Sequence, residues 1–167
     1  MSRPRYSWWS YAKEMVRRYP RYCREWEELK TISATPNYGA VGHGSGISKP
    51  TEQVALRLLP ASKQIEFDAV HDAIADVERQ KNGCDVMRLI KMVYWKNSHT
   101  LAGAAMKIGI GADTAWQWHG DFIRLVGLHR GLMTREEWLV DKKKREEAKK
   151  KWAEKQKDTG QSHNSVL

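Results

Sequence analysis

Apolar residues recur every three or four positions through most of this chain, and this spacing constrains the fold more than any other feature. A helix turns once every 3.6 residues, so the spacing gathers apolar side chains on one face that can be buried. Alternation with a period of two, which is typical of strands, is scarce. The clearest stripes are Trp8, Tyr11, Met15 and Tyr19; Phe67, Val70, Ile74 and Val77; and Val86, Leu89, Ile90 and Val93. The sequence therefore predicts an all-α protein.

Changes in composition divide the chain into four predicted segments. Residues 1–30 are a basic helical segment whose first helix is expected to end at Pro20, because the residue before a proline is pushed out of helical geometry. Residues 31–49 are rich in glycine, serine and threonine, which predicts a flexible linker. Residues 50–133 form a helical domain, and residues 134–167 form a charged helical tail with a disordered end.

Local signals predict where the helices of the domain begin and end. Pro50 suits the first turn of a short helix over "PTEQVALRLL". Asn82 and Gly83 are expected to end the helix that carries Val77, because glycine tolerates the left-handed geometry of many helix ends. Asp85 is then expected to cap the next helix.

The charge of the chain points to a polyanionic partner. The 167 residues carry a formal net charge of +9, with a pI of about 9.6. Such a protein favours nucleic acid first and an anionic membrane surface second. No apolar run approaches the roughly 18 residues that span a bilayer, and the basic N-terminus lacks the apolar centre of a secretory signal. Cys23 and Cys84 have no paired spacing, which predicts reduced thiols in a cytoplasmic protein.

Residues 100–126, "TLAGAAMKIGIGADTAWQWHGDFIRLV", predict two helices joined by a tight corner. Thr100 is expected to cap a helix of about two turns, in which Ala104 and Ala105 leave room for a crossing helix. Gly109 is expected to reverse the chain, since glycine adopts positive φ without a steric penalty. A second helix starts near Ala112 and buries one face: Ala115, Trp118, Phe122 and Leu125. The pattern is typical of a helix-turn-helix at about residues 100–127.

The free face of this second helix is the predicted DNA-binding site, because a helix-turn-helix places that helix in the major groove. Gln117 can pair with an adenine edge, Asp113 can accept from a cytosine amino group, and Ala112 can touch a thymine methyl group. Trp116 can cover a sugar or a methyl group. Backbone contacts are expected from Thr114 and His119, and from Arg124 and Arg130 towards the far end. The predicted face carries Gly111, Ala112, Asp113, Thr114, Trp116, Gln117 and Gly120. The alternative for each polar residue is a solvated side chain.

The tail segment "TREEWLVDKKKREEAKKKWAEKQKD" is mostly charged and predicts an exposed helix. Two basic triplets, Lys142–Lys144 and Lys149–Lys151, flank Glu146 and Glu147. The helix can lie along phosphates and add affinity for any DNA sequence, or it can be a solubilising extension. Both interpretations stay open.

The sequence predicts no enzyme, no cofactor and no metal site. Its six histidines are scattered, and none pairs with a cysteine or another histidine at metal-binding spacing. No Ser-His-Asp or paired-carboxylate pattern occurs. The glycines of "GAVGHGSG" follow no predicted strand and precede no suitably spaced lysine, which argues against a phosphate-binding loop.

The stretches "RPRYSWWSYAKEMVRRYP" and "LIKMVYWKNSHTLAGAAMKIGIGADTAWQWHGDFIRLVG" resemble phage- and prophage-encoded transcriptional regulators of the ArpU/RinA type. The most specific parts are "YWKNSHTLAGAA" and "WHGDFIRLV". The resemblance implies a C-terminal half similar to the fourth region of bacterial sigma factors, with a recognition helix from Ala112 to Val126. It further implies double-stranded DNA and host RNA polymerase as partners, in the cytoplasm of a bacterial host. Gly111 departs from the serine that usually caps this helix, so the cap is weaker.

Two other functions remain open. A small terminase subunit also binds phage DNA through a helical corner but works as a ring. A protein-interaction adaptor would use the same corner against a protein and never touch DNA. Neither the operator sequence, nor activation versus repression, nor the oligomeric state follows from one chain.

Overall fold

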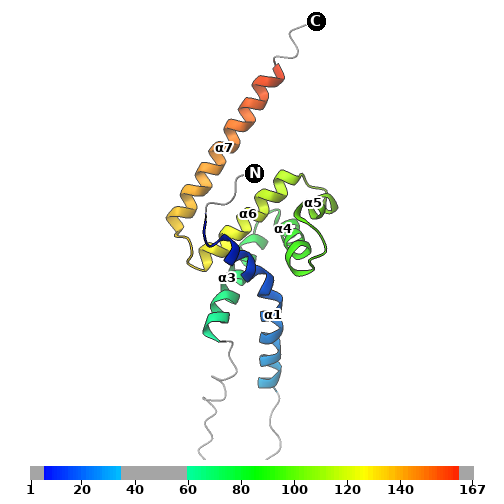
Figure 1. Cartoon of the computed structure of the whole chain (residues 1–167), viewed down its shortest axis with the longest axis vertical. Helices are drawn as coiled ribbons and strands as arrows, with labels where there is room; N and C mark the ends of the chain where they lie inside the picture. The colour runs from blue at the N-terminus through cyan, green and yellow to red at the C-terminus, as the bar shows by residue number, and fades with distance from the viewer. Residues whose placement is uncertain (1–5, 35–59, 162–167) are drawn as a thin grey trace, which may run out of the picture.

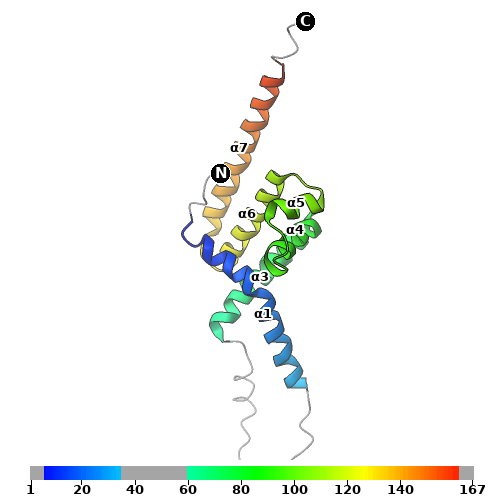
Figure 2. The ribbon, with the colours of Figure 1, turned by 45° about the vertical axis from the view of Figure 1, so that its right-hand side comes forward.

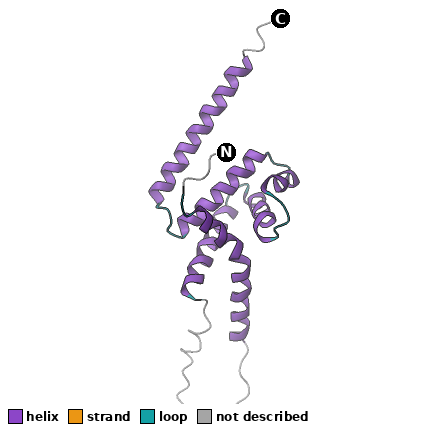
Figure 3. Cartoon of the chain, in the orientation of Figure 1, coloured by secondary structure: helices purple, strands orange, loops and turns teal. Residues whose placement is uncertain are grey.

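A computed structural model of the chain describes residues 6–34 and 60–161. All regular structure within these two ranges is helical (Figure 3), which confirms the all-α class for the described residues. The helices are α1 (Trp9–Ala34), α3 (Ala61–Glu78), α4 (Gly83–Ile90), the π-helix η1 (Lys91–Trp95), α5 (Leu101–Ile108), α6 (Ala112–His129) and α7 (Arg135–Gln161). None of the helices in these ranges is both long enough and apolar enough to span a membrane.

The centre of the fold is formed by α1, α3 and α6, with α4 and α5 packed on one side of α6 (Figure 1). The apolar stripes predicted from the sequence meet in one core. Its most deeply buried members are Met15, Val16, Val70, Ile90, Phe122, Ile123 and Val126. The C-terminal end of α6 leads into α7, which extends away from the other helices (Figures 1 and 2).

Pro20 does not end the first helix, contrary to the prediction, because α1 runs through it to Ala34. A proline inside a helix leaves the carbonyl four residues earlier without its N–H donor. Here that carbonyl belongs to Val16, and the indole N–H of Trp95 donates to it at 3.0 Å. The replacement donor comes from η1, so a distant residue satisfies the carbonyl that Pro20 leaves without its helical donor.

The junction between α3 and α4 also differs from the prediction. α3 ends at Glu78, and α4 begins at Gly83, so Asp85 lies inside the first turn and Asn82 occupies the cap position. Gly83 is required here for close packing, since a Cβ atom would collide with the carbonyl oxygen of Val77.

Two of the predicted segments lie wholly or mostly outside the described residues. The short helix expected within 50–59 is one of them. The other is the linker predicted for residues 31–49, of which only the first four residues are described, as the last turn of α1.

The N-terminal end of α1 is anchored to α6 through Trp8 and Gly127. A Cβ atom on Gly127 would lie 2.6 Å from Cζ3 of the Trp8 ring, so the ring rests directly on the helix backbone. Tyr6 stacks on Trp8, with ring centroids 4.8 Å apart.

Replacing Gly127 by alanine is expected to lower the free energy of unfolding by about 1–3 kcal/mol, because the added methyl group forces Trp8 or α6 to move. In a Trp8→Ala chain the clash is absent. The same change should there be neutral or stabilising, since alanine favours a helix over glycine by roughly 1 kcal/mol. Urea unfolding of the four chains measures the difference, and equal costs in both backgrounds would contradict this packing.

Candidate nucleic-acid interface

The corner between α5 and α6 is built by local hydrogen bonds that match the prediction. Thr100 caps α5, with its Oγ1 accepting from the N–H of Gly103 at 3.2 Å. Gly109 has φ 81° and ψ 31°, the left-handed conformation that favours glycine. Its N–H donates to the carbonyls of Ala105 and Met106 at 3.0 and 3.2 Å. Two carbonyls in the last turn of α5 are therefore satisfied as the chain turns.

Small side chains let the two helices of the corner approach closely. Ala104 and Ala105 of α5 and Ala115 of α6 are buried, as predicted, in a cluster with Leu89 and Leu101. Ile108, Ile110 and Trp118 pack partly buried around this cluster. One face of α6 is therefore held against α5, while Phe122 continues the same helix into the main core.

The first two turns of α6 leave a single exposed face. Gly111 stands at the cap position without a side-chain hydrogen bond, as expected for a weak cap. Thr114 is partly buried, and the side chain of Trp116 is unusually open for tryptophan, at 45% exposure. We call the exposed members of this face the α6 patch: Gly111, Ala112, Asp113, Trp116 and Gln117. Five of the ten predicted site residues thus lie together in solvent.

His119 and Gly120 do not belong to the α6 patch, contrary to the prediction, because α1 covers them. His119 is 7% exposed, and its ring meets that of Trp9 edge-on, with centroids 6.3 Å apart. Trp9 also lies over buried Gly120. Neither residue is available to contact DNA. The N-terminal helix thus shortens the free face of α6 to its first two turns.

Arg124 is held inside the protein rather than presented to DNA, contrary to the prediction. Its side chain is only 17% exposed, its Nε lies 2.9 Å from Oδ2 of Asp141, and its guanidinium lies 5.4 Å above the Trp9 ring. Arg130 follows the last residue of α6, about 20 Å along the helix axis from Gln117. The structure does not bring either arginine to the α6 patch.

Two cations of the basic segment 1–30, Lys13 and Arg17, lie close to the Tyr94–His119 pair. Arg17 is exposed and places its guanidinium 5.6 Å from the ring centroid of Tyr94. The Tyr94 hydroxyl in turn lies 2.6 Å from Nε2 of His119. Lys13 stands one turn nearer the start of α1 and acts electrostatically on His119. The spacing of Trp9, Lys13 and Arg17 reveals a shared helix face, but only long-range packing places that face beside α6.

The buried pair of Tyr94 and His119 supports the helix directly beneath Trp116. Burial first, and then the nearby charges of Lys13 and Arg124, together lower the pKa of His119 to about 4. Burial also raises the pKa of Tyr94. Both groups are therefore neutral at pH 7, and the pair adds a hydrogen bond without adding charge.

Comparison with known proteins gave no match to any protein-family model, curated protein or solved structure.

Within the described ranges, no group of three or more His, Cys, Asp or Glu side chains is arranged to hold a metal ion.

Acid is expected to destabilise the protein through His119. Because its folded pKa of about 4 lies below the ordinary value of 6.5, the unfolded chain binds more protons between these values. The resulting stabilisation is complete above pH 6.5 and is lost as the pH falls towards 4, by about 3 kcal/mol in total.

Urea unfolding between these pH values measures the loss. His119→Gln should flatten the profile in this window, while His99→Gln, outside the cluster, should leave it unchanged. An equally steep profile in the His119 variant would rule out this assignment.

Proposed function

We propose that the corner of α5 and α6 is a helix-turn-helix that binds double-stranded DNA, and that the chain regulates phage or prophage transcription. The observation that carries the proposal is the division of α6 into two faces. Ala115 and Phe122 are buried, while Asp113 and Gln117, at the N-terminal end, are exposed. A recognition helix needs this arrangement, since its N-terminal residues contact base edges in the major groove.

The α6 patch carries the chemistry for reading bases. Gln117 donates to and accepts from an adenine edge, and Asp113 accepts from a cytosine amino group. Trp116 and Ala112 offer apolar contact to thymine methyl groups. These contacts distinguish sequences but bring little attraction to phosphates, because Asp113 is the one charged residue from Gly111 to Gln117.

The distribution of charge supports an approach of DNA from the α6 side. Between Ala61 and Glu78, α3 carries one cation, Lys63, and five carboxylates: Glu66, Asp68, Asp72, Asp76 and Glu78. This acidic helix repels phosphates. Lys13 and Arg17 lie instead on the edge of α1 that borders α6, where they can pair with phosphates beside the groove.

The regulatory part of the proposal, including contact with host RNA polymerase, is supported by the resemblance of "YWKNSHTLAGAA" and "WHGDFIRLV" to ArpU/RinA-type regulators. The first stretch begins at the end of η1 and includes most of α5, and the second lies within α6. Footprinting on the phage genome that encodes the chain tests it, and protection confined to promoter regions is the expected result.

Replacing Gln117 by alanine is expected to weaken binding to the footprinted site by about 1–3 kcal/mol, while binding to random duplex stays nearly unchanged. The reason is that Gln117 pairs with a base edge and not with phosphate. Gln80→Ala, which removes an exposed glutamine after α3, is the matched control and should change neither affinity. Equal losses on both duplexes in the Gln117 variant would exclude base readout by this residue.

Two measurements separate the proposal from its rivals. A monomer or dimer in solution agrees with a regulator, whereas a ring would favour a small terminase subunit. Negligible affinity for every duplex at low salt, where phosphate attraction is strongest, would favour a protein-interaction adaptor.

A further inference from the structure

A cluster of four charged residues fixes the first half of α7 against α6. Asp141 Oδ2 lies 2.9 Å from Arg124 Nε and 3.0 Å from Arg145 Nε. Arg145 Nη1 also pairs with Asp121 Oδ1. Three members are largely shielded from solvent, with side chains of Arg124, Asp141 and Arg145 exposed by 17%, 23% and 32%. Among the described residues, neither Arg124 Nε nor Asp141 Oδ2 has a hydrogen-bond partner, so the link between the two helices here is charge attraction, which solvent and salt screen less than at an exposed surface pair.

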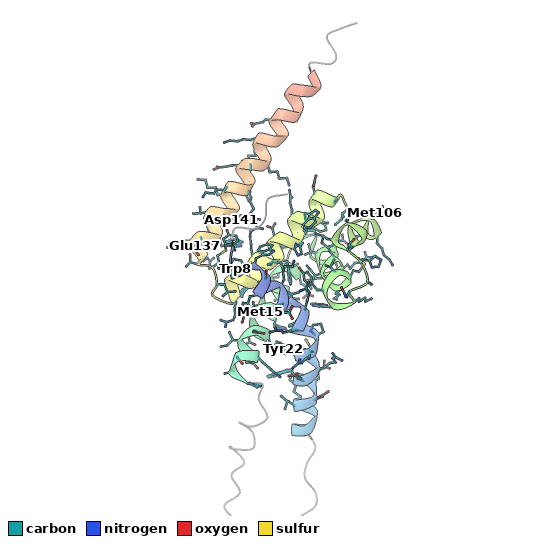
Figure 4. All side chains as sticks on the ribbon, in the orientation of Figure 1. Trp8, Met15, Tyr22, Met106, Glu137 and Asp141 are labelled. Atoms are coloured by element: carbon teal, nitrogen blue, oxygen red, sulfur yellow. The ribbon has the colours of Figure 1, made fainter. Side chains whose placement is uncertain are left out.

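The start of α7 is fixed as well. The hydroxyl of Thr134 accepts from the N–H of Glu137 at 3.2 Å, and the Glu137 carboxylate accepts from the N–H of Thr134 at 2.8 Å. This reciprocal capping box begins the helix at a defined residue. Figure 4 shows Glu137 and Asp141 where the first turns of α7 pass the rest of the molecule.

The pairing places α7 antiparallel to α6. Asp141 meets Arg124, whereas Arg145, further along α7, meets Asp121, which comes earlier in α6. Asp121 follows Gln117 by one helical turn, so both lie on one side of α6. The first half of α7 therefore covers the far end of the same side whose near end is the α6 patch. The second half of α7 extends beyond this contact, away from the other helices (Figures 1 and 2).

The second half of α7 is long and basic. From residue 148 to residue 161 it reads "AKKKWAEKQKDTGQ", with five lysines and two carboxylates. Lys149, Lys150 and Lys151 are exposed. From Arg145 to the last helical residue, Gln161, the helix extends about 24 Å, twice the width of a major groove. A helix of this length is long enough to extend from a major groove across the row of phosphates beside it.

We propose that α7 is a basic arm, held beside α6 by the four-charge cluster, whose Lys149–Lys151 segment contacts the phosphates of the DNA that the α6 patch reads. The inference rests on the proposed function, because it needs DNA on the α6 patch. Residues 111–117 contain no lysine or arginine that could attract phosphates. The lysines of α7 would supply that attraction.

The first experiment measures binding of the full chain to a random-sequence duplex of about three helical turns, between about 50 and 200 mM salt. Replacing Lys149–Lys151 by alanine should reduce the slope of log affinity against log salt by up to about 3, since each neutralised phosphate contributes roughly 0.9. The matched control removes three exposed cations on the side of α3 and α4, as Arg79→Ala, Lys81→Ala and Arg88→Ala. It changes the net charge equally and should reduce the slope much less.

The second experiment tests the cluster. Arg145→Ala and Lys143→Ala each remove one charge from α7, but Lys143 is not part of the cluster. Arg145→Ala should weaken binding several-fold more than Lys143→Ala in the natural chain. In a chain whose Lys149–Lys151 are already alanine, Arg145→Ala and Lys143→Ala should weaken binding equally. The cluster then no longer positions any lysines at residues 149–151.

The outcomes distinguish the arm from the function on which it rests. If the natural chain binds no duplex at any salt concentration, the proposed function fails. If it binds, but both triple variants lose the same slope, the arm is refuted while DNA binding stands. Tighter binding by the Lys149–Lys151 variant would show that α7 obstructs the α6 patch, and that result also overturns the arm.

Discussion

The burial of α6 on nearly all sides is the constraint on which the rest of the structure depends. α6 packs against α1, α3, α4, α5 and α7, and Phe122, Ile123 and Val126 are almost fully enclosed. A helix surrounded in this way can present only what its neighbours leave uncovered. Trp8 and Trp9 close one side, α5 closes another, and the α7 cluster closes the far end. The α6 patch is the part of the α6 surface that these neighbours leave exposed. Its position therefore depends on the packing around α6 as much as on its own residues.

The local parts of this arrangement could be predicted from the sequence, and the long-range parts could not. Spacing identified the buried face with Ala115 and Phe122, and Gly109 has the positive φ expected at the corner. Both depend on residues within a few positions of each other. The prediction that Pro20 ends the first helix is wrong because the donor to the Val16 carbonyl, Trp95, is 79 residues away from it in sequence. The Thr134–Glu137 spacing is a further local signal in the sequence, and it marks the start of α7.

The errors at the site have one physical cause. The sequence predicts Gly120 on the free face and His119 and Arg124 as backbone contacts, because a helix considered alone exposes every position outside its apolar stripe. In the folded chain Trp9 covers the first two, and Asp141 pairs with the third. An arginine or histidine near a recognition face is therefore ambiguous from sequence. Its role depends on whether a carboxylate or an aromatic ring from another helix pairs with it or covers it in the folded chain, or leaves it exposed to solvent.

The separation of base-reading residues from cations has a consequence for how such a protein would find and leave its site. If the chain binds DNA as proposed, attraction from cations of α1 and α7 would act on any duplex and weaken with salt, whereas contacts from Gln117 and Asp113 would act only in register with the right bases. A chain built this way can associate with DNA through its flanking helices before α6 enters the groove. The neutral pair of Tyr94 and His119 fits this arrangement, because it supports α6 without altering the local charge. Specificity and affinity can then change independently, since the residues that carry them lie on different helices.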